Sequence, residues 1–267
     1  MQWNLKATEA VKRVPFFVRK RVRARVEEEA LRHGDAAAML EHVERCRRRF
    51  LERREDEVKG YEVETCFGRG GCPNRAVTFD NLAEEIEHLL DRRKVRDVLV
   101  EKVAGPLKFH HEFRVSVSDC PNGCSRPQIA DVGIIGAMKP AVGKNPCDHC
   151  GRCLAVCRES AISLEEEGPV IFENRCLSCG ACVRGCPAGA LEEGQRGYRI
   201  LLGGKLGRHP RLGEEIPGIQ RREEVLSVIE DCLDLYRDYG RKGERLGSLL
   251  DRVGMKKFGE NKKNGAA

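Results

Sequence analysis

Residues 7–53 carry apolar side chains at the spacing of an amphipathic helix, within a segment that is otherwise strongly basic. The valines that recur every four residues are Val18, Val22 and Val26. Pro15 precedes them, at a place where the first turn of a helix accepts proline. Helical spacing returns over residues 36–50. These patterns predict a helical N-terminal module built from two helices.

The rest of the chain mixes two periodicities, which predicts an α+β fold. Alternation and short apolar runs predict strands over residues 61–65, 113–118, 129–136 and 198–202. Helical spacing predicts helices over residues 79–90 and 223–239, and Asp80 is the expected N-cap of the first. The tail, residues 256–267, is basic and rich in Gly and Asn, so we expect it to be disordered.

The composition adds fourteen cysteines and a modest positive charge to this picture. The chain of 267 residues holds 48 Lys and Arg against 42 Asp and Glu, which gives a net charge of +6. It contains no apolar run of about 18 residues, and its first residues form no signal-peptide core. We therefore expect a cytoplasmic protein without a membrane span. Thiols stay reduced in the cytosol, which favours metal ligation over disulfides.

The densest basic run, residues 19–25, raises the alternative of nucleic-acid binding. Glu27, Glu28 and Glu29 follow it at once, and no aromatic residue interleaves with it. We therefore expect no nucleic-acid partner. A solvated helix face, or a surface that meets an acidic electron donor, agrees better with this charge pattern.

Eight cysteines between residues 143 and 193 form a doubled motif of spacing C-x2-C-x2-C-x3-C. The two halves are Cys147, Cys150, Cys153 and Cys157, then Cys176, Cys179, Cys182 and Cys186. In such runs the first three thiolates bind one 4Fe–4S cluster and the fourth binds the other cluster. Crossed ligation therefore assigns Cys147, Cys150, Cys153 and Cys186 to one cluster, and Cys176, Cys179, Cys182 and Cys157 to the other. Zinc sites use paired C-x2-C units, and the doubled register argues against them.

Four further cysteines stand on two separate segments. Cys66 and Cys72 have the spacing C-x5-C, and Cys120 and Cys124 have the spacing C-x3-C. Neither spacing suits a zinc finger or a ferredoxin. Four thiolates on two loops could hold one more cubane cluster.

These two spacings, together with residues 119–136, resemble those of the sirohaem-4Fe–4S sulfite and nitrite reductases. Residues 198–210 and 236–245 resemble later parts of the same domain. The resemblance implies one sirohaem-binding half-domain of the sulfite reductase type, over residues 58–142 and 194–255. Within it, the resemblance implies an inserted ferredoxin domain with two clusters over residues 143–193, as in small single-repeat members of the family. Large members resemble a duplicated chain with sirohaem between two halves, so a homodimer is an expectation here.

In that family the last cysteine of C-x3-C binds the cubane and also bridges to the sirohaem iron, a role that the resemblance gives to Cys124. It further implies three 4Fe–4S clusters and one sirohaem as cofactors, sulfite or nitrite as a small oxyanion substrate, and an external protein as electron donor. Basic side chains should surround the anionic groups. The candidates for contact with the anion are Arg69, Lys108, Arg114 and Arg126. The candidates for contact with sirohaem are Asn122, Lys205 and Arg208, and each candidate has the alternative of an ordinary surface role.

Two other functions stay open at this point. One is an electron-transfer subunit with three clusters and no haem, and the other is a sirohaem protein that acts as a sensor or in biosynthesis without turnover. Residues 11–20 also resemble the small helical module of light-independent protochlorophyllide reductase, which suggests a docking or capping role for residues 7–53.

Four other candidate ligands receive no role. Cys46 and Cys232 have no partner at metal-ligand spacing, and we expect both to be buried in the manner of apolar residues. His110 and His111 are adjacent, so on a strand at most one of them can face a site.

Overall fold

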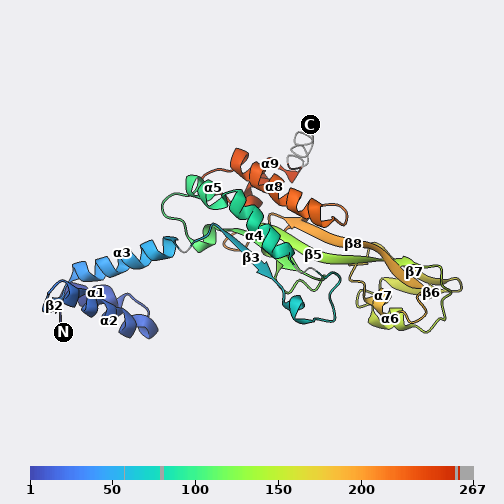
Figure 1. The fold of residues 1–267 in the computed structure, drawn as a ribbon, viewed down its shortest axis with the longest axis horizontal. Helices are drawn as coiled ribbons and strands as arrows, with labels where there is room; N and C mark the ends of the chain where they lie inside the picture. The colour runs from blue at the N-terminus through green and yellow to red at the C-terminus, as the bar shows by residue number, and fades with distance from the viewer. Residues whose placement is uncertain (57, 79–80, 256–257, 259–267) are drawn as a thin grey trace. The chain divides into compact units, whose positions relative to one another are not determined.

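The computed structural model describes residues 1–56, 58–78, 81–255 and 258, with side chains described except at residues 51–56 and 69. The chain forms two compact units, Met1–Lys59 and Gly60–Ala267 (Figure 1). Among the described residues, no helix combines the length and the apolar character needed to cross a bilayer.

The first unit contains three helices and a short parallel pair of strands. Its elements are β1 (Gln2–Trp3), α1 (Leu5–Lys12), α2 (Phe16–Arg32), β2 (Ala37–Ala38) and α3 (Leu40–Asp56). The helical prediction is confirmed, but the predicted number of two helices is wrong. Pro15 is the N-cap residue of α2 rather than part of its first turn, because its ψ of 137° lies outside the helical region. Val26 is buried, whereas Val18 and Val22 are only partly buried.

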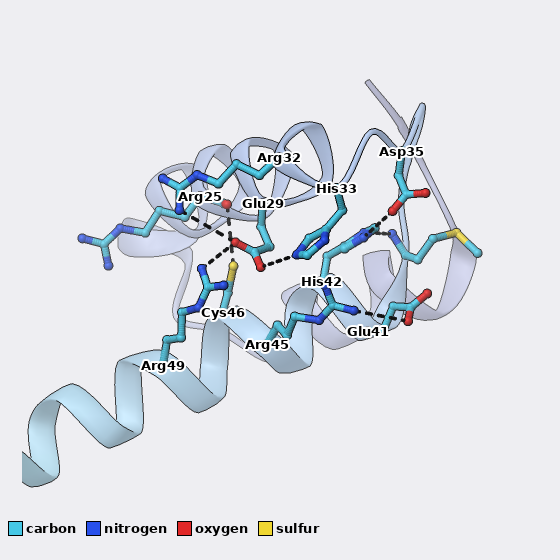
Figure 2. A network of polar contacts seen from close by, with 11 residues as sticks. Arg25, Glu29, Arg32, His33, Asp35, Glu41, His42, Arg45, Cys46 and Arg49 are labelled. Carbon is cyan, nitrogen blue, oxygen red and sulfur yellow. Dashed lines mark hydrogen bonds and ion pairs between the residues drawn. The ribbon is translucent and has the colours of Figure 1, made fainter.

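A buried polar network joins α2 to α3 (Figure 2). Glu29 is 2 % exposed, and its carboxylate accepts a hydrogen bond from Arg49 at 2.7 Å and pairs with His33 at 3.2 Å. Burial opposes ionisation of Glu29, but Arg49 and His33 outweigh it and lower the pKa of this carboxyl. The thiol of Cys46 lies 3.6 Å from the carbonyl oxygen of Arg25, and Cys46 is half-buried rather than buried as predicted. Because a buried charge without its partner is costly, this network fixes the packing of the two helices.

The second unit is centred on a five-stranded mixed sheet with the order β3-β4-β5-β8-β9. Its strands are β3 (Tyr61–Thr65), β4 (Phe113–Ser118), β5 (Val132–Val142), β8 (Leu191–Leu202) and β9 (Glu214–Glu215). β3, β4 and β5 run parallel, and β8 runs antiparallel to β5 along its whole length. The four predicted strands are confirmed, although β5 begins three residues later than predicted and β8 begins seven residues earlier.

Among the described residues, four helices of eight residues or more accompany this sheet. They are α4 (Leu82–Arg92), α5 (Val95–Lys102), α8 (Arg222–Tyr239) and α9 (Leu246–Val253). α4 packs on β3 and α8 packs on β8, and the two helices contact one another, so they cover the same face of the sheet (Figure 1). Asn81 holds the N-cap position of α4, and Asp80, the predicted cap, lies outside the described residues.

Three short 3-10 helices lie in the connections. They are η1 (Phe67–Gly70), η2 (Phe109–His111) and η3 (Pro127–Ile129). The assumption that His110 and His111 lie on a strand is wrong, because both belong to η2, where their ring centroids are 4.1 Å apart. The buried position predicted for Cys232 is confirmed on α8, where it is 0 % exposed.

Between β5 and β8 the chain leaves the sheet and folds into a small lobe over residues 143–190, which we call the cysteine lobe (Figure 1). It contains α6 (Arg152–Val156), β6 (Ile162–Glu165), β7 (Gly168–Ile171) and α7 (Ala181–Gly185). β6 and β7 pair antiparallel, and α6 contacts α7. The two long strands therefore carry the lobe at their far ends. Of the predicted tail, only Phe258 is described, and it is buried.

Candidate functional site

Two cysteine pairs follow neighbouring parallel strands of the sheet. Cys66 and Cys72 lie on the loop after β3, and Cys120 and Cys124 lie on the loop after β4. Because β3 and β4 are parallel neighbours, both loops leave the sheet at the same edge. Cys120 is buried, Cys66 and Cys72 are half-buried, and Cys124 is exposed. The four thiols therefore extend from the interior to the surface.

Backbone contacts hold these two loops against one another and against β5. The N–H of Cys66 donates to the carbonyl of Val117 at 3.0 Å, and the N–H of Ala76 donates to the carbonyl of Asp119 at 2.9 Å. Gly136 of β5 lies beside this crossing, where an added Cβ would stand 2.4 Å from the Asp119 carbonyl oxygen. A side chain at position 136 would therefore push the cysteine loops away from the sheet.

A buried ion pair connects the two loops. Nε of Arg75 lies 2.9 Å from Oδ2 of Asp119, and the two side chains are 17 % and 9 % exposed. Arg75 follows Cys72 by three residues, and Asp119 directly precedes Cys120. Nη2 of Arg75 is buried without a hydrogen-bond partner among the described residues. A negatively charged group held beside these thiols would satisfy it, since a buried guanidinium nitrogen needs an acceptor.

Hydrogen bonds also reach two of the four sulfur atoms. The N–H groups of Gly68 and Asp119 donate to Sγ of Cys66 at 3.4 Å and 3.3 Å. Nδ2 of Asn122 donates to Sγ of Cys124 at 3.0 Å. Donors aimed at sulfur stabilise a thiolate and help to set the reduction potential of a cluster that it binds.

The four thiols are close enough to act on one another. Burial raises the pKa of the Cys120 thiol, and a hydrogen bond from the backbone N–H of Asn122 lowers it. The charges of Cys124, Cys66 and Cys72 raise the pKa of Cys120 further. Such thiols become a stable group of thiolates when a positively charged metal centre neutralises their charge.

Cys124 is exposed, but its chain neighbour is firmly held. Ser125 is 2 % exposed, and its hydroxyl donates to the carbonyl of Val117 at 2.8 Å and lies 2.7 Å from the hydroxyl of Ser118. The N–H of Ser125 donates to the same Ser118 hydroxyl at 3.2 Å. These buried bonds to β4 fix the backbone next to the exposed thiol.

The cysteine lobe contains two copies of one loop conformation. In the first copy His149 has a φ of 54° and Gly151 a φ of 71°. In the second copy Ser178 has a φ of 56° and Gly180 a φ of 69°. In each copy the N–H of the non-glycine residue donates to a cysteine Sγ at 3.4 Å. The repeat seen in the sequence is therefore also a repeat of the backbone.

The thiols of the lobe interact in two groups. Burial raises the pKa of Cys153, opposed by backbone hydrogen bonds, and it raises the pKa of Cys182 to about 11. The thiols that raise the pKa of Cys153 further are Cys147 and Cys186. Those that raise the pKa of Cys182 further are Cys179, Cys176 and Cys157. This grouping agrees with the crossed assignment, and ligation itself stays a prediction.

One of these groups adjoins the cysteine loops of the sheet. The N–H of Met138 on β5 donates to the carbonyl of Ser178 at 2.6 Å, and Met138 forms a β-bridge with Cys179. The side chain of Met138 packs with Cys120, and Val183 of α7 packs against the same cluster. We call Cys157, Cys176, Cys179 and Cys182 the inner set, and Cys147, Cys150, Cys153 and Cys186 the outer set.

The thiol groups suit cubane clusters better than single ions. Among the described residues, no three His, Cys, Asp or Glu side chains are arranged to hold one metal ion. In a cubane each thiolate binds a different iron, so its ligands need not converge on one point. The paired loops, the interacting thiols and the N–H groups aimed at sulfur fit such a group.

Two of the basic residues predicted to contact an anion are engaged in ion pairs. Arg114 pairs with Glu62 at 3.2 Å, and Arg126 pairs with Glu64 at 2.8 Å. Both glutamates belong to β3, and Glu62 lies directly across from Arg114 in the strand register. The side-chain charge of each arginine is therefore balanced within the chain.

The other predicted contacts are dispersed. Nζ of Lys205 donates to the hydroxyl of Ser248 at 2.5 Å, and Lys108 and Arg208 are exposed. The side chain of Arg69 lies outside the described residues. Two cavities, of about 590 Å³ between α4 and α8 and about 280 Å³ beside Cys176, are not lined by any of these predicted contacts.

Two arginines that take part in ion pairs were not predicted from the sequence. Arg75 lies beside the cysteine loops, whereas Arg245 pairs with Asp131 and donates to the carbonyl of His110 at 2.9 Å, at the opposite end of β4. Asp131 is 1 % exposed and also accepts the N–H of Arg114 at 2.9 Å. Asp131 and Arg245 lie within the segments that resemble the reductase family, and this position could have marked them as candidates.

Comparison with known proteins agrees with this geometry. The model of the nitrite and sulphite reductase 4Fe-4S domain matches residues 61–264, and that of the proto-chlorophyllide reductase 57 kD subunit matches residues 3–47. The coenzyme F420-dependent sulfite reductase of Methanocaldococcus jannaschii is 37 % identical over 204 residues, which are 74 % of this chain and 30 % of that protein. The dissimilatory-type sulfite reductase alpha subunit of Allochromatium vinosum is 22 % identical over 230 residues, 76 % of this chain and 54 % of that protein.

The fold is also similar to that of a solved structure. Dissimilatory sulfite reductase I matches with a TM-score of 0.51 and 23 % identity over 75 % of this chain and 51 % of that chain. The second unit thus has an α+β fold of the sulfite reductase kind. The chain belongs to the nitrite and sulphite reductase 4Fe-4S domain family. It spans about a third of the length of the archaeal relative and about half of the A. vinosum relative.

Proposed function

We propose that this chain carries three 4Fe–4S clusters and a sirohaem and takes part in the reduction of sulfite or nitrite. In this proposal Cys66, Cys72, Cys120 and Cys124 hold one cluster, and the inner and outer sets hold one each. The observation that carries it is the group of four interacting thiols on the loops after β3 and β4. The sulfite reductase named among the relatives supports the choice of substrate.

Sirohaem bound here would supply an iron at which an oxyanion is reduced. The chain's own part is to hold and order the sulfur ligands. Cys124, the exposed thiol of its group, is the one accessible to a haem, with Asn122 donating to its sulfur and Ser125 fixing its backbone. The buried Cys120 and the packed Met138 keep water from the space between the two thiol groups.

The relay of electrons follows from the same contacts. The inner set touches Met138, and Met138 touches Cys120, so a cluster bound by the inner set would lie next to one bound by the four thiols of the sheet loops and could pass electrons to it. The outer set receives them from an external donor protein, consistent with the exposed Cys150. Single electrons delivered in sequence suit a multi-electron reduction.

The second candidate is an electron-transfer protein without turnover of its own. It is favoured by the ion pairs of Arg114 and Arg126, which leave those two charges balanced by Glu62 and Glu64. A substrate anion would then be bound by basic groups supplied elsewhere.

The test uses the full chain purified without oxygen, and the variants Cys124→Ser and Cys46→Ser. We expect wild type to show sirohaem bands in the visible spectrum, iron for three clusters, and turnover of sulfite or nitrite with a reduced dye. Cys124→Ser should lose turnover and the magnetic coupling of haem to cluster, while the clusters of the lobe persist. Cys46 lies in the first unit and serves as the control. Unchanged turnover in Cys124→Ser would refute the proposal, and full iron without sirohaem bands would favour the second candidate.

A further inference from the structure

The inner loop of the cysteine lobe is contacted by two arginines. Nη1 of Arg199 donates to the carbonyl of Leu177 at 3.4 Å, and Nη2 of Arg184 donates to the carbonyl of Cys179 at 3.2 Å. Leu177 lies between the first two cysteines of this loop. Arg199 also interacts electrostatically with the thiol of Cys176. Two positive charges therefore lie against the inner set.

The outer loop carries a negative charge at the equivalent place. The position that corresponds to Leu177 in the repeat is Asp148. Its carboxylate accepts the N–H of Cys150 at 3.2 Å. The nearby Arg152 offsets part of this charge. Asp148, Arg152 and Arg184 are all exposed and partly screened by water, so the less exposed Arg199 is the strongest of these charges. The two loops thus share one backbone conformation and differ in the sign of the charge placed on it.

Arg199 is held in position from its other side. Its Nε and Nη2 donate to the two carboxylate oxygens of Glu215 at 2.6 Å and 2.5 Å. Its side chain is 22 % exposed, against 37 % for Glu215. The bidentate geometry fixes the guanidinium, while the contact with the Leu177 carbonyl places the positive charge nearer to the loop than the carboxylate.

We propose that Arg184, Arg199 and Asp148 make the inner cluster easier to reduce than the outer one, so that electrons run from the outer set to the inner set. The inference rests on the proposed function, because it assumes that both sets hold a 4Fe–4S cluster. Reduction adds one electron to a cluster. A fixed positive charge nearby stabilises the reduced form and raises its potential, and a fixed negative charge lowers it. The two loops therefore share one backbone conformation, while the charges beside them shift the two cluster potentials in opposite directions.

The experiment is a redox titration of the full chain, purified without oxygen and followed by electron paramagnetic resonance. Cys179→Ser and Cys150→Ser identify which signal belongs to the inner and which to the outer cluster. Arg199→Gln should lower the potential of the inner cluster, and Asp148→Asn should raise that of the outer cluster. We expect each to change the ratio of reduced to oxidised cluster about tenfold at a fixed potential, which for one electron is about 59 mV.

Two further variants separate charge from structure. Arg199→Lys keeps the positive charge and should keep the inner potential close to that of wild type. Arg196→Gln, on the same strand, removes an exposed arginine that pairs with Glu193 and should shift neither potential. Equal potentials in wild type, or charge variants that shift no more than Arg196→Gln, would overturn the inference. If the lobe held no clusters, iron content would be low and the signals would be missing in every variant, which differs from equal potentials. Loss of sirohaem or of turnover alone would leave both potentials measurable.

Discussion

The contact made by Met138 gives the most direct test of how the cysteine lobe is attached. The substitution Met138→Ala removes a side chain that is 5 % exposed and packs with Ala76, Cys120 and Val183. It leaves the hydrogen bond from the N–H of residue 138 to the carbonyl of Ser178 in place, because alanine has the same backbone. The substitution removes the packing of this side chain against α7 and against Ala76 and Cys120.

The size of the effect follows from the burial of the side chain. Replacing a buried methionine by alanine costs about 2–5 kcal/mol. The cluster around Met138 is small, which places the cost near the lower limit, about 2 kcal/mol. A loss of about 2 kcal/mol increases the population of the opened lobe by about thirtyfold.

Amide hydrogen exchange measured by mass spectrometry is the suitable assay. We expect about thirtyfold faster exchange over residues 176–183 in Met138→Ala, as the loss of about 2 kcal/mol of packing free energy implies. Tryptophan fluorescence would miss this change, because the single tryptophan, Trp3, lies in the first unit. Met39→Ala, at a residue that is 39 % exposed in that unit, is the matched control. Exchange over residues 176–183 that stays at the wild-type rate would refute the reasoning.

Two further predictions concern the lobe and the acid stability of the second unit. Cys150→Ser and Cys179→Ser should each lose or convert one cluster by iron analysis, while sirohaem stays bound, and loss of both cofactors from a folded variant would contradict this. Hydrogen bonds from Arg252 and from a backbone N–H lower the pKa of Glu244 below its ordinary value of 4.5. The ionised carboxylate therefore stabilises the fold above that pH. This contribution is lost as the pH falls through the pKa that Glu244 has in the folded protein. Glu244→Gln should therefore lower the free energy of unfolding by about 1 kcal/mol at neutral pH. It should also weaken the dependence of this free energy on pH below neutrality, measured by guanidinium unfolding. A pH dependence equal to that of wild type would contradict the prediction.

The strands that the sequence predicts best are those with one clear period. The alternation in residues 61–65 and 113–118 coincides with β3 and β4. The outer half of β8 was missed because residues 192–196 are exposed and polar, with no alternation to read. The outer half of β5 contains Pro140, which weakens a strand pattern. These halves are held by pairing with each other over the full hairpin, which is a long-range contact that local patterns do not contain.

In the candidate site too, some residues could be predicted from the sequence and others could not. Cysteine spacing carries information about ligation because a short loop limits which thiols can meet, and the thiol groups agree with that spacing. Basic residues carry no such information, since their role depends on the partner that folding brings to them. Arg114 was predicted to contact an anion, but the strand register sets it opposite Glu62. Arg199 was not predicted, and folding brings it to the inner loop.

The spacing between the two thiol groups is fixed by a single strand. Gly136 gives the room that the loop of Cys120 needs, and Met138 touches the loop of Cys179. Residues two apart on a strand project from the same face, and they are separated by about 7 Å along it. The two contacts therefore share one rigid segment of β5, which is buried from Val132 to Met138. If these thiol groups hold clusters as proposed, electron transfer between them needs no movement of the lobe. A variant that loosens the lobe should then slow this transfer without changing either group of thiols.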